Sequence, residues 1–176
     1  QLGIDPPRLA VVSMDCTNSN LKSISNRTFS NSQMIVQRAF EDISEENGFD
    51  NPTSKANSQY GKGIIKKYGK DIGLIVPRTG GNEHFVLTKD LLILLVSTTL
   101  IPGDSLTIEA FFKDIGIRYG FVFDNDGFNK ANSEINSKQR VFYSDTLSWF
   151  VEMLDECGYY ISLSDALSLV KNNNLE

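Results

Sequence analysis

Few residues in this 176-residue sequence are placed to carry out covalent chemistry. His84 is the only histidine, and it lies in a β-prone apolar run of a chain without a nucleophile elbow, so we interpret it as a structural histidine. Cys16 and Cys157 are far apart and form no CxxC spacing, which argues against a zinc site and against a disulfide framework. We therefore expect that both cysteines are reduced and that the protein binds no cofactor. We assign no catalytic residue and do not expect the protein to be an enzyme.

Three aspartates are the candidates for a divalent-ion site: Asp15, Asp124 and Asp126. The segment that begins at Asp124 departs from a calcium-binding loop, because its sixth position is Asn129 rather than glycine and its twelfth is Ile135 rather than glutamate. A metal ion held by the three aspartates could instead support phosphodiester cleavage. A metal-dependent nuclease or phosphoesterase is therefore the alternative function.

The basic residues gather in one cluster, which consists of Lys62, Lys66, Lys67 and Lys70. Isoleucines and tyrosines alternate with these lysines, and this spacing predicts a short amphipathic helix with a solvated lysine face. The competing interpretation is a strip of cations that contacts a phosphate backbone.

A glycine-rich turn follows the lysine cluster and contains Arg78, Gly80 and Gly81. It separates two β-prone runs, residues 73–77 and 84–88, and therefore predicts a β-hairpin. Backbone N–H groups beside glycines can form a concavity for an anion, and Arg78 would add a positive charge there. An ordinary hairpin turn without a ligand is the simpler interpretation.

The composition favours a single good-sized domain or two small ones, with 40% hydrophobic residues to form a core. The only long apolar run, residues 91–96, is too short to cross a bilayer, so we expect no membrane span. The net charge of −5 is unevenly divided, because residues 88–176 hold thirteen of the 22 acidic side chains and seven of the 17 basic ones. An acidic C-terminal half argues against extensive nucleic-acid contact there.

In the N-terminal third, the pattern predicts a buried strand at residues 8–15 and an irregular Ser- and Asn-rich loop at 17–28. A helix follows from Ser30 or Ser32 to about Asn47, with Gly48 at its end. Residues 50–63 contain few apolar residues and are the predicted linker or domain boundary.

In the C-terminal half, Thr88 is predicted to cap a helix that is apolar nearly all round and lies in the centre of the core. A second helix is expected at 107–116 with Gly116 as its C-cap, then a strand at 117–123, a turn at 124–127 and an exposed insertion at 129–140. A third helix is expected at 144–158 and a hairpin at 159–170, with a short helix from Ser164 as the competing interpretation of the latter.

This order of helix, turn, helix, short strand, helix and hairpin resembles the winged helix-turn-helix superfamily over residues 88–170. The resemblance is carried by residues 107–116 as second helix, 144–158 as third helix and 159–170 as wing, and it implies a groove-reading third helix. Such a helix normally presents Arg, Lys, Asn or Gln to DNA, whereas this one presents acidic residues and no basic residue. More than twenty residues also separate it from the second helix. Both departures favour a winged helix that contacts protein.

The sequence therefore predicts an α+β fold, a helical core with short strands and hairpins whose C-terminal half is winged-helix-like. Residues 1–60 form an N-terminal strand, loop and helix, and 61–174 form the winged-helix-like domain with its preceding hairpin, either separately or as one continuous domain. Because the chain begins with Gln1 and its residues 175–176 resemble a cloning scar, we expect a cytoplasmic fragment of a larger protein.

The predicted function is that of a non-catalytic interaction or regulatory module. Its expected partner is another protein or a neighbouring domain of the full-length chain. Nucleic-acid contact through the lysine cluster is a secondary hypothesis.

Overall fold

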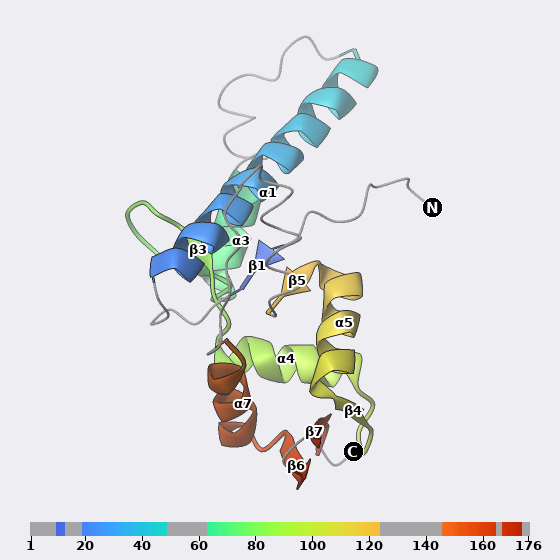
Figure 1. Cartoon of the computed structure of the whole chain (residues 1–176). Helices are drawn as coiled ribbons and strands as arrows, with labels where there is room; N and C mark the ends of the chain where they lie inside the picture. Colours follow the sequence, from blue (N-terminus) through green and yellow to red (C-terminus); the bar gives the residue numbers. More distant parts are fainter. Residues whose placement is uncertain (1–9, 13–18, 49–62, 124–145, 165–166, 174–176) are drawn as a thin grey trace.

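The computed structural model describes residues 10–12, 19–48, 63–123, 146–164 and 167–173, and these form a mixed helix and sheet structure, which confirms the α+β fold class (Figure 1). The helices in these ranges are α1 (Ser19–Glu46), α3 (Gly63–Asp71), α4 (Lys89–Thr99), α5 (Ile108–Tyr119) and α7 (Thr146–Glu156). The strands are β1 (Ala10–Val11), β2 (Ile75–Val76), β3 (His84–Phe85), β4 (Ser105–Thr107), β5 (Phe121–Val122), β6 (Tyr160–Ser164) and β7 (Leu167–Lys171). None of the described helices is long and apolar enough to cross a lipid bilayer.

The strands form three small sheets. β1 and β5 pair in parallel, β2 and β3 pair antiparallel, and β4, β7 and β6 form an antiparallel sheet in that order. Figure 1 shows α4, α5, α7 and the three-stranded sheet grouped at one end of the molecule, while the C-terminal half of α1 extends away from the rest at the other end.

Helix α1 begins well before the sequence pattern predicted, so the expected irregular loop at 17–28 is wrong for the part of it that is described. Ile24, Ser25, Thr28 and Phe29 recur at helical spacing and are all buried, and the helix packs against β1 and β3. Burial of this face outweighs the tendency of Ser and Asn to leave helical conformation, and the Thr28 hydroxyl is satisfied within the helix by the Ser25 carbonyl at 2.8 Å.

Ser25 joins α1 to the edge of β3. Its hydroxyl donates to the Phe85 carbonyl oxygen at 3.0 Å and accepts from the Phe85 N–H at 2.8 Å. Strand β3 pairs with β2 on its other side. The Ser25 hydroxyl therefore satisfies the backbone N–H and C=O groups of Phe85 that a neighbouring strand would otherwise bind. The ring of Phe29 also meets the ring of Phe85 edge to face, with centroids 5.5 Å apart.

Both predicted N-caps in the C-terminal half are present. The Thr88 side chain accepts from the Leu91 N–H at the start of α4, and the Thr107 side chain accepts from the Ala110 N–H at the start of α5. Helix α4 is not buried all round, however, because Ile93 and Leu94 are exposed. The packing of α4 leaves one side of this apolar helix on the surface.

Helix α5 buries the four residues that the spacing predicted, Ile108, Phe111, Phe112 and Ile115. It continues past Gly116 and ends at Gly120, which adopts the left-handed conformation with φ 70°. The predicted C-cap at Gly116 and strand start at 117 are therefore wrong, and β5 contains only two residues. Glycine at the C-terminal cap removes the Cβ clash of this conformation, and Gly120 rather than Gly116 occupies that position.

The predicted C-terminal hairpin is present as β6 and β7, with a register irregularity between Ser162 and Ser164. Strand β4 was not predicted, because three residues that end at a helix cap show little periodicity. It pairs with β7 from Ser105 to Thr107. The side chain of Asn172, directly after β7, is buried and donates to the Leu100 carbonyl oxygen at 2.8 Å. This bond ties the end of the sheet to the end of α4.

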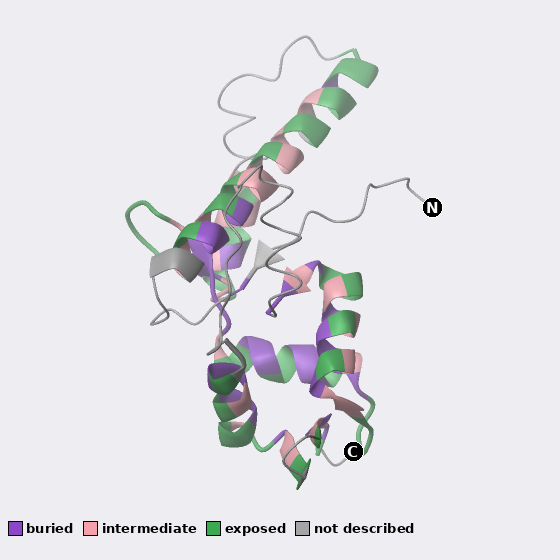
Figure 2. Cartoon of the chain, viewed as in Figure 1, coloured by how far each residue is buried: buried purple, intermediate pink, exposed green. Residues whose placement is uncertain are grey.

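One buried cluster connects these parts and includes Val12, Phe29 and Ile75 as well as residues of α4, α5 and α7 (Figure 2). At its centre lie three phenylalanine rings. The centroids of Phe112 and Phe150 are 4.8 Å apart, and those of Phe123 and Phe150 are 5.3 Å apart. Apolar burial of this kind supplies most of the stability of a domain of this size.

Two helical glycines provide a matched test of the packing of α3. A Cβ on Gly69 would lie 2.8 Å from Ile75 Cγ1, and Ile75 is fully buried, whereas a Cβ on Gly116 would meet only the Phe121 carbonyl oxygen at 3.6 Å. We expect Gly69→Ala to lower the free energy of unfolding by about 1–2 kcal/mol, because overpacking exceeds the gain in helix propensity. Gly116→Ala should leave it unchanged or raise it by up to about 1 kcal/mol.

Urea denaturation followed by circular dichroism measures both variants. Equal stability of the two alanine variants would contradict the close packing of α3 on β2.

Candidate functional site

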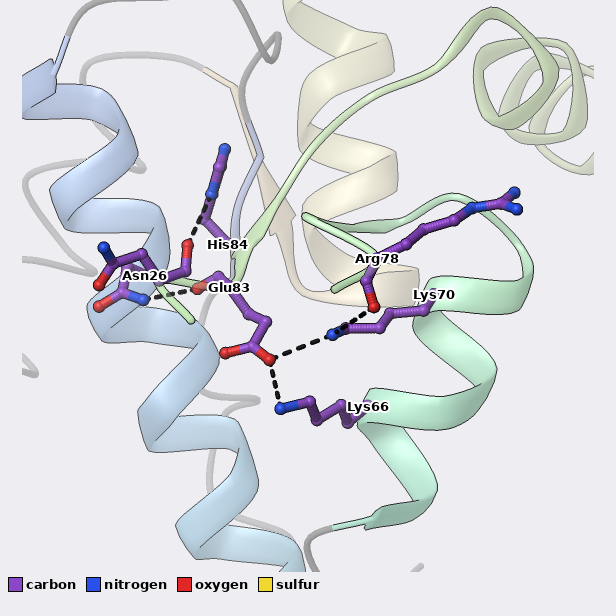
Figure 3. Close-up of polar contacts among 7 residues, drawn as sticks. Asn26, Lys66, Lys70, Arg78, Glu83 and His84 are labelled. Atoms are coloured by element: carbon purple, nitrogen blue, oxygen red, sulfur yellow. Dashed lines mark hydrogen bonds and ion pairs between the residues drawn. The ribbon is translucent and has the colours of Figure 1, made fainter. Parts of the chain in front are cut away.

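Glu83 precedes β3 and makes polar contacts with residues of two helices (Figure 3). Its Oε1 atom accepts from the Nζ of Lys70 at 3.1 Å and forms an ion pair with the Nζ of Lys66. Its backbone oxygen accepts from Nδ2 of Asn26 on α1 at 2.6 Å. Lys70 also donates to the Arg78 carbonyl oxygen at 3.1 Å. We call these contacts the Glu83 clamp, because they hold α1, α3 and the β2–β3 hairpin together.

The two ammonium groups stabilise the ionised form of Glu83. They lower its pKa from the ordinary value of 4.5 to about 2, with the Lys66 contact as the largest cause, burial acting against it and Lys70 adding to it. The side chains of Glu83 and Lys70 are only 12% and 13% exposed, while Lys66 is 42% exposed. The Glu83–Lys70 pair is therefore shielded from water more than a surface salt bridge is.

The clamp changes the interpretation of the predicted lysine cluster. Lys66 and Lys70 point toward Glu83, so their charges are largely balanced inside the molecule (Figure 3). Lys67 points elsewhere: it is exposed, and its Nζ lies 5.8 Å from the centroid of the Tyr68 ring. Lys62 lies outside the described residues. The four lysines therefore do not act as one uniformly cationic face, and anion binding by Lys62 or Lys67 stays a prediction.

The hairpin turn is present where the glycines predicted it. Arg78, Gly80 and Gly81 are all exposed, and Gly80 has a φ of 95°, a conformation that favours glycine. A Cβ at Gly80 or Gly81 would meet nothing within 4 Å, so neither glycine is required for a close approach within the chain. The turn geometry accounts for Gly80, and an anion site at the turn stays a prediction.

His84 is buried in β3, and its structural role stays a prediction. Its Nδ1 lies 3.1 Å from the backbone oxygen of Asn82, within the same turn. Cys157 is half-buried at the end of α7, and burial is the largest cause of a raised pKa of its thiol, which disfavours the reactive thiolate. Cys16 lies outside the described residues.

The three candidate metal-binding aspartates, Asp15, Asp124 and Asp126, also lie outside the described residues. The strands that precede them in the chain, β1 and β5, are parallel, with Ala10 beside Phe121 and Val11 beside Val122. The chain therefore continues from Val12 and from Phe123 at the same edge of this sheet. Within the described ranges, no group of three His, Cys, Asp or Glu residues could hold a metal ion. The metal-site hypothesis stays a prediction.

Helix α7 has one apolar and one acidic side. Trp149, Phe150, Met153 and Leu154 are buried, whereas Glu152, Asp155 and Glu156 are exposed. The eleven residues of this helix include no lysine or arginine. Only Glu156 has a described cationic neighbour, Lys89, at 3.0 Å. The acidic third helix that the sequence predicted is therefore a feature of the surface.

A second surface was not singled out from the sequence. Helix α3 carries an open apolar depression of about 290 Å³ lined by Ile64, Ile65, Tyr68, Gly69, Ile72 and Leu74. Ile64, Tyr68 and Ile72 are exposed and recur every four residues. That spacing places them on one side of the helix and can be recognised in the sequence. The pattern alone does not show whether such a side faces the core or water.

Comparison of the chain with known proteins adds no relative. No family model, curated protein or solved structure matches it. The function therefore has to be argued from the surfaces described above.

The Glu83 clamp predicts a pH-dependent contribution to stability. Because the pKa of Glu83 is depressed in the folded chain, the clamp stabilises the fold above pH 4.5, and this contribution is lost as the pH falls from 4.5 toward 2. We expect Glu83→Gln to lower the free energy of unfolding by about 1–3 kcal/mol at pH 7, because bonds to a charged group are lost. The deficit should shrink as the pH approaches 2.

Asp114→Asn is the matched control, since Asp114 forms an exposed ion pair with Arg118 at 3.4 Å. It should cost at most about 1 kcal/mol. Urea denaturation of the wild type and both variants at pH 7 and pH 3 measures these differences. Equal losses in the two variants, or a Glu83→Gln deficit that does not change with pH, would contradict the clamp.

Proposed function

We propose that residues 89–171 form a winged-helix-like interaction module that binds a protein through α7 and does not read DNA with that helix. The order of elements supports this proposal. Helices α4 and α5 are followed by the short strand β5, helix α7 and the β6–β7 hairpin, which is the order on which the resemblance to winged helix domains rests. Strand β4 joins the hairpin to the start of α5, so the hairpin is part of the folded body.

The observation that carries the proposal is the acidic exposed side of α7. A helix that lies in the major groove meets phosphates along its flanks and base edges at its tip, and both contacts favour basic or amide side chains. Glu152 and Asp155 would instead bring carboxylates toward phosphates. This repulsion opposes binding most strongly at low salt, where the attraction of DNA for basic proteins is greatest.

A protein partner with a basic surface fits α7 better. Exposed carboxylates on a rigid helix attract Lys or Arg side chains of a partner and set their orientation. Glu152 and Asp155 are three residues apart and therefore neighbours on the helix surface, so they present two negative charges together. The buried residues on the other side of α7 belong to one cluster with residues of α4 and α5, and this packing holds the helix in place.

Nucleic-acid contact through the lysine cluster is the competing function. The Glu83 clamp counts against it, since balanced charges contribute little to phosphate binding. The exposed Lys67 is the described lysine best placed for such contact.

Fluorescence anisotropy with labelled duplex and single-stranded DNA at low and moderate salt separates the two functions. We expect no binding by the wild-type chain under either condition. Binding that weakens steeply with salt, is lost in Lys67→Glu and is retained in Lys113→Glu would contradict the proposal and assign the nucleic-acid function to α3. Lys113 is a suitable control because it is exposed on α5.

The positive arm of the same test uses chemical cross-linking in a cell extract. A double variant, Glu152→Lys with Asp155→Lys, should lose a protein cross-link that Glu109→Lys retains, because Glu109 is exposed on α5. An unchanged cross-linking pattern in the double variant would contradict a partner on α7.

A further inference from the structure

Helix α3 presents an apolar surface to the solvent. Tyr68 is 59% exposed, Ile72 is 56% exposed, and Ile64 is exposed one turn before Tyr68. Together with Ile65, Gly69 and Leu74 they line the depression of about 290 Å³. Exposed apolar side chains that gather around a depression indicate a contact surface, in contrast to isolated ones, which are common on any protein.

Two exposed charges flank this surface on one side of α3. Lys67 lies beside the Tyr68 ring, and Asp71 follows Lys67 by four residues, which is about one helical turn. From the N-terminus to the C-terminus of α3, this flank therefore carries a positive charge followed by a negative charge. Lys66 and Lys70 do not add to it, because both are bound to Glu83.

The C-terminal half of α1 carries a complementary pattern. Ile43 is 60% exposed, and Ala39, one turn earlier, is exposed as well. Arg38 and Asp42 are exposed, four residues apart, and both lie on the same flank of Ile43. This flank also reads positive and then negative along its helix.

These two patterns match when the helices are antiparallel. Residues on the same flank of two antiparallel helices face each other, so Asp42 meets Lys67 while Arg38 meets Asp71. The equal four-residue spacing lets both pairs form at once, with Ile43 directed at the depression between them. Figure 1 shows that this half of α1 extends away from the rest of the chain, and Figure 2 shows that it is largely exposed.

We propose that two copies of the chain associate by packing α1 of one copy antiparallel against α3 of the other. Ile43 of the second copy occupies the depression on α3, Asp42 pairs with Lys67, and Arg38 pairs with Asp71. The contact joins two different surfaces, α1 of one copy and α3 of the other, so it is heterologous and links copies head to tail. This association is independent of the surface of α7.

The end of α1 supports the proposal independently of the matching charges. Its last turn contains acidic residues and no basic residue, although the negative end of the helix dipole favours cations there. Asp42, Glu45 and Glu46 are all exposed. A cation from a second copy, Lys67, would relieve this unfavourable arrangement. Departures from local preference of this kind are expected at functional surfaces.

Sedimentation velocity of the chain over a range of concentrations tests the proposal. We expect the wild type to associate as its concentration rises. Ile43→Ser should raise the dissociation constant of the contact by about tenfold or more, because the burial of one isoleucine is lost. Met34→Ser should leave it unchanged, since Met34 is also exposed but lies about two and a half turns from Ile43, on the opposite side of α1. Both residues are exposed in the monomer, so circular dichroism should show an unchanged fold.

A charge exchange identifies the partner of Lys67. Lys67→Glu and Asp42→Lys should each raise the dissociation constant by about tenfold or more when measured alone. An equimolar mixture of the two should associate as the wild type does, because alternating copies meet through one natural pair and one reversed pair. A monomeric wild type, an Ile43→Ser variant that associates as strongly as the wild type, or a mixture that does not recover would each overturn the proposal. A monomeric wild type would mean that the depression on α3 receives a different molecule.

Discussion

Glu83 joins α1, α3 and the β2–β3 hairpin through polar contacts. Its carboxylate binds Lys66 and Lys70 of α3, and its backbone oxygen binds Asn26 of α1. Ser25, one residue before Asn26, satisfies both backbone groups of Phe85 on the same strand edge. The clamp and the serine fix the side by side arrangement of α1 and the hairpin, and they also remove two lysines from the surface. Structure and surface charge are therefore set by the same contacts.

Much of the C-terminal half could be predicted from the sequence because its signals are local. The N-caps at Thr88 and Thr107 and the spacing of Ile108, Phe111 and Ile115 each depend on residues a few positions apart. The predictions were wrong where contacts between residues far apart in the sequence determine the secondary structure. Residues 19–28 are helical because they pack against strands such as β3, from which Ser25 is separated by 60 residues, and β4 exists because β7 pairs with it. The basic cluster was visible in the sequence, but the pairing of Lys66 and Lys70 with Glu83 depends on the fold of the hairpin.

The exposed surfaces of α7 and α3 differ in the contacts that they offer. The exposed side of α7 carries carboxylates, and its apolar side is buried in the core. The exposed surface of α7 therefore offers electrostatic contact. Helix α3 presents Lys67 beside uncovered apolar side chains, so its surface offers both charge and apolar burial. Apolar burial favours a durable contact, while a charged rim mainly directs orientation and rate of association. The two surfaces are thus suited to different partners, a basic protein at α7 and a second copy at α3.

The central claim is that Lys66 and Lys70 stabilise the fold through Glu83 and do not form part of a phosphate-binding strip. Nuclear magnetic resonance of the Glu83 side-chain carboxyl carbon as a function of pH tests it most directly. The clamp predicts a titration midpoint near pH 2, and removal of both ammonium groups in a Lys66→Ala, Lys70→Ala variant should move the midpoint toward the ordinary value of 4.5. A wild-type midpoint near 4.5 would contradict the clamp and return Lys66 and Lys70 to the exposed cationic surface.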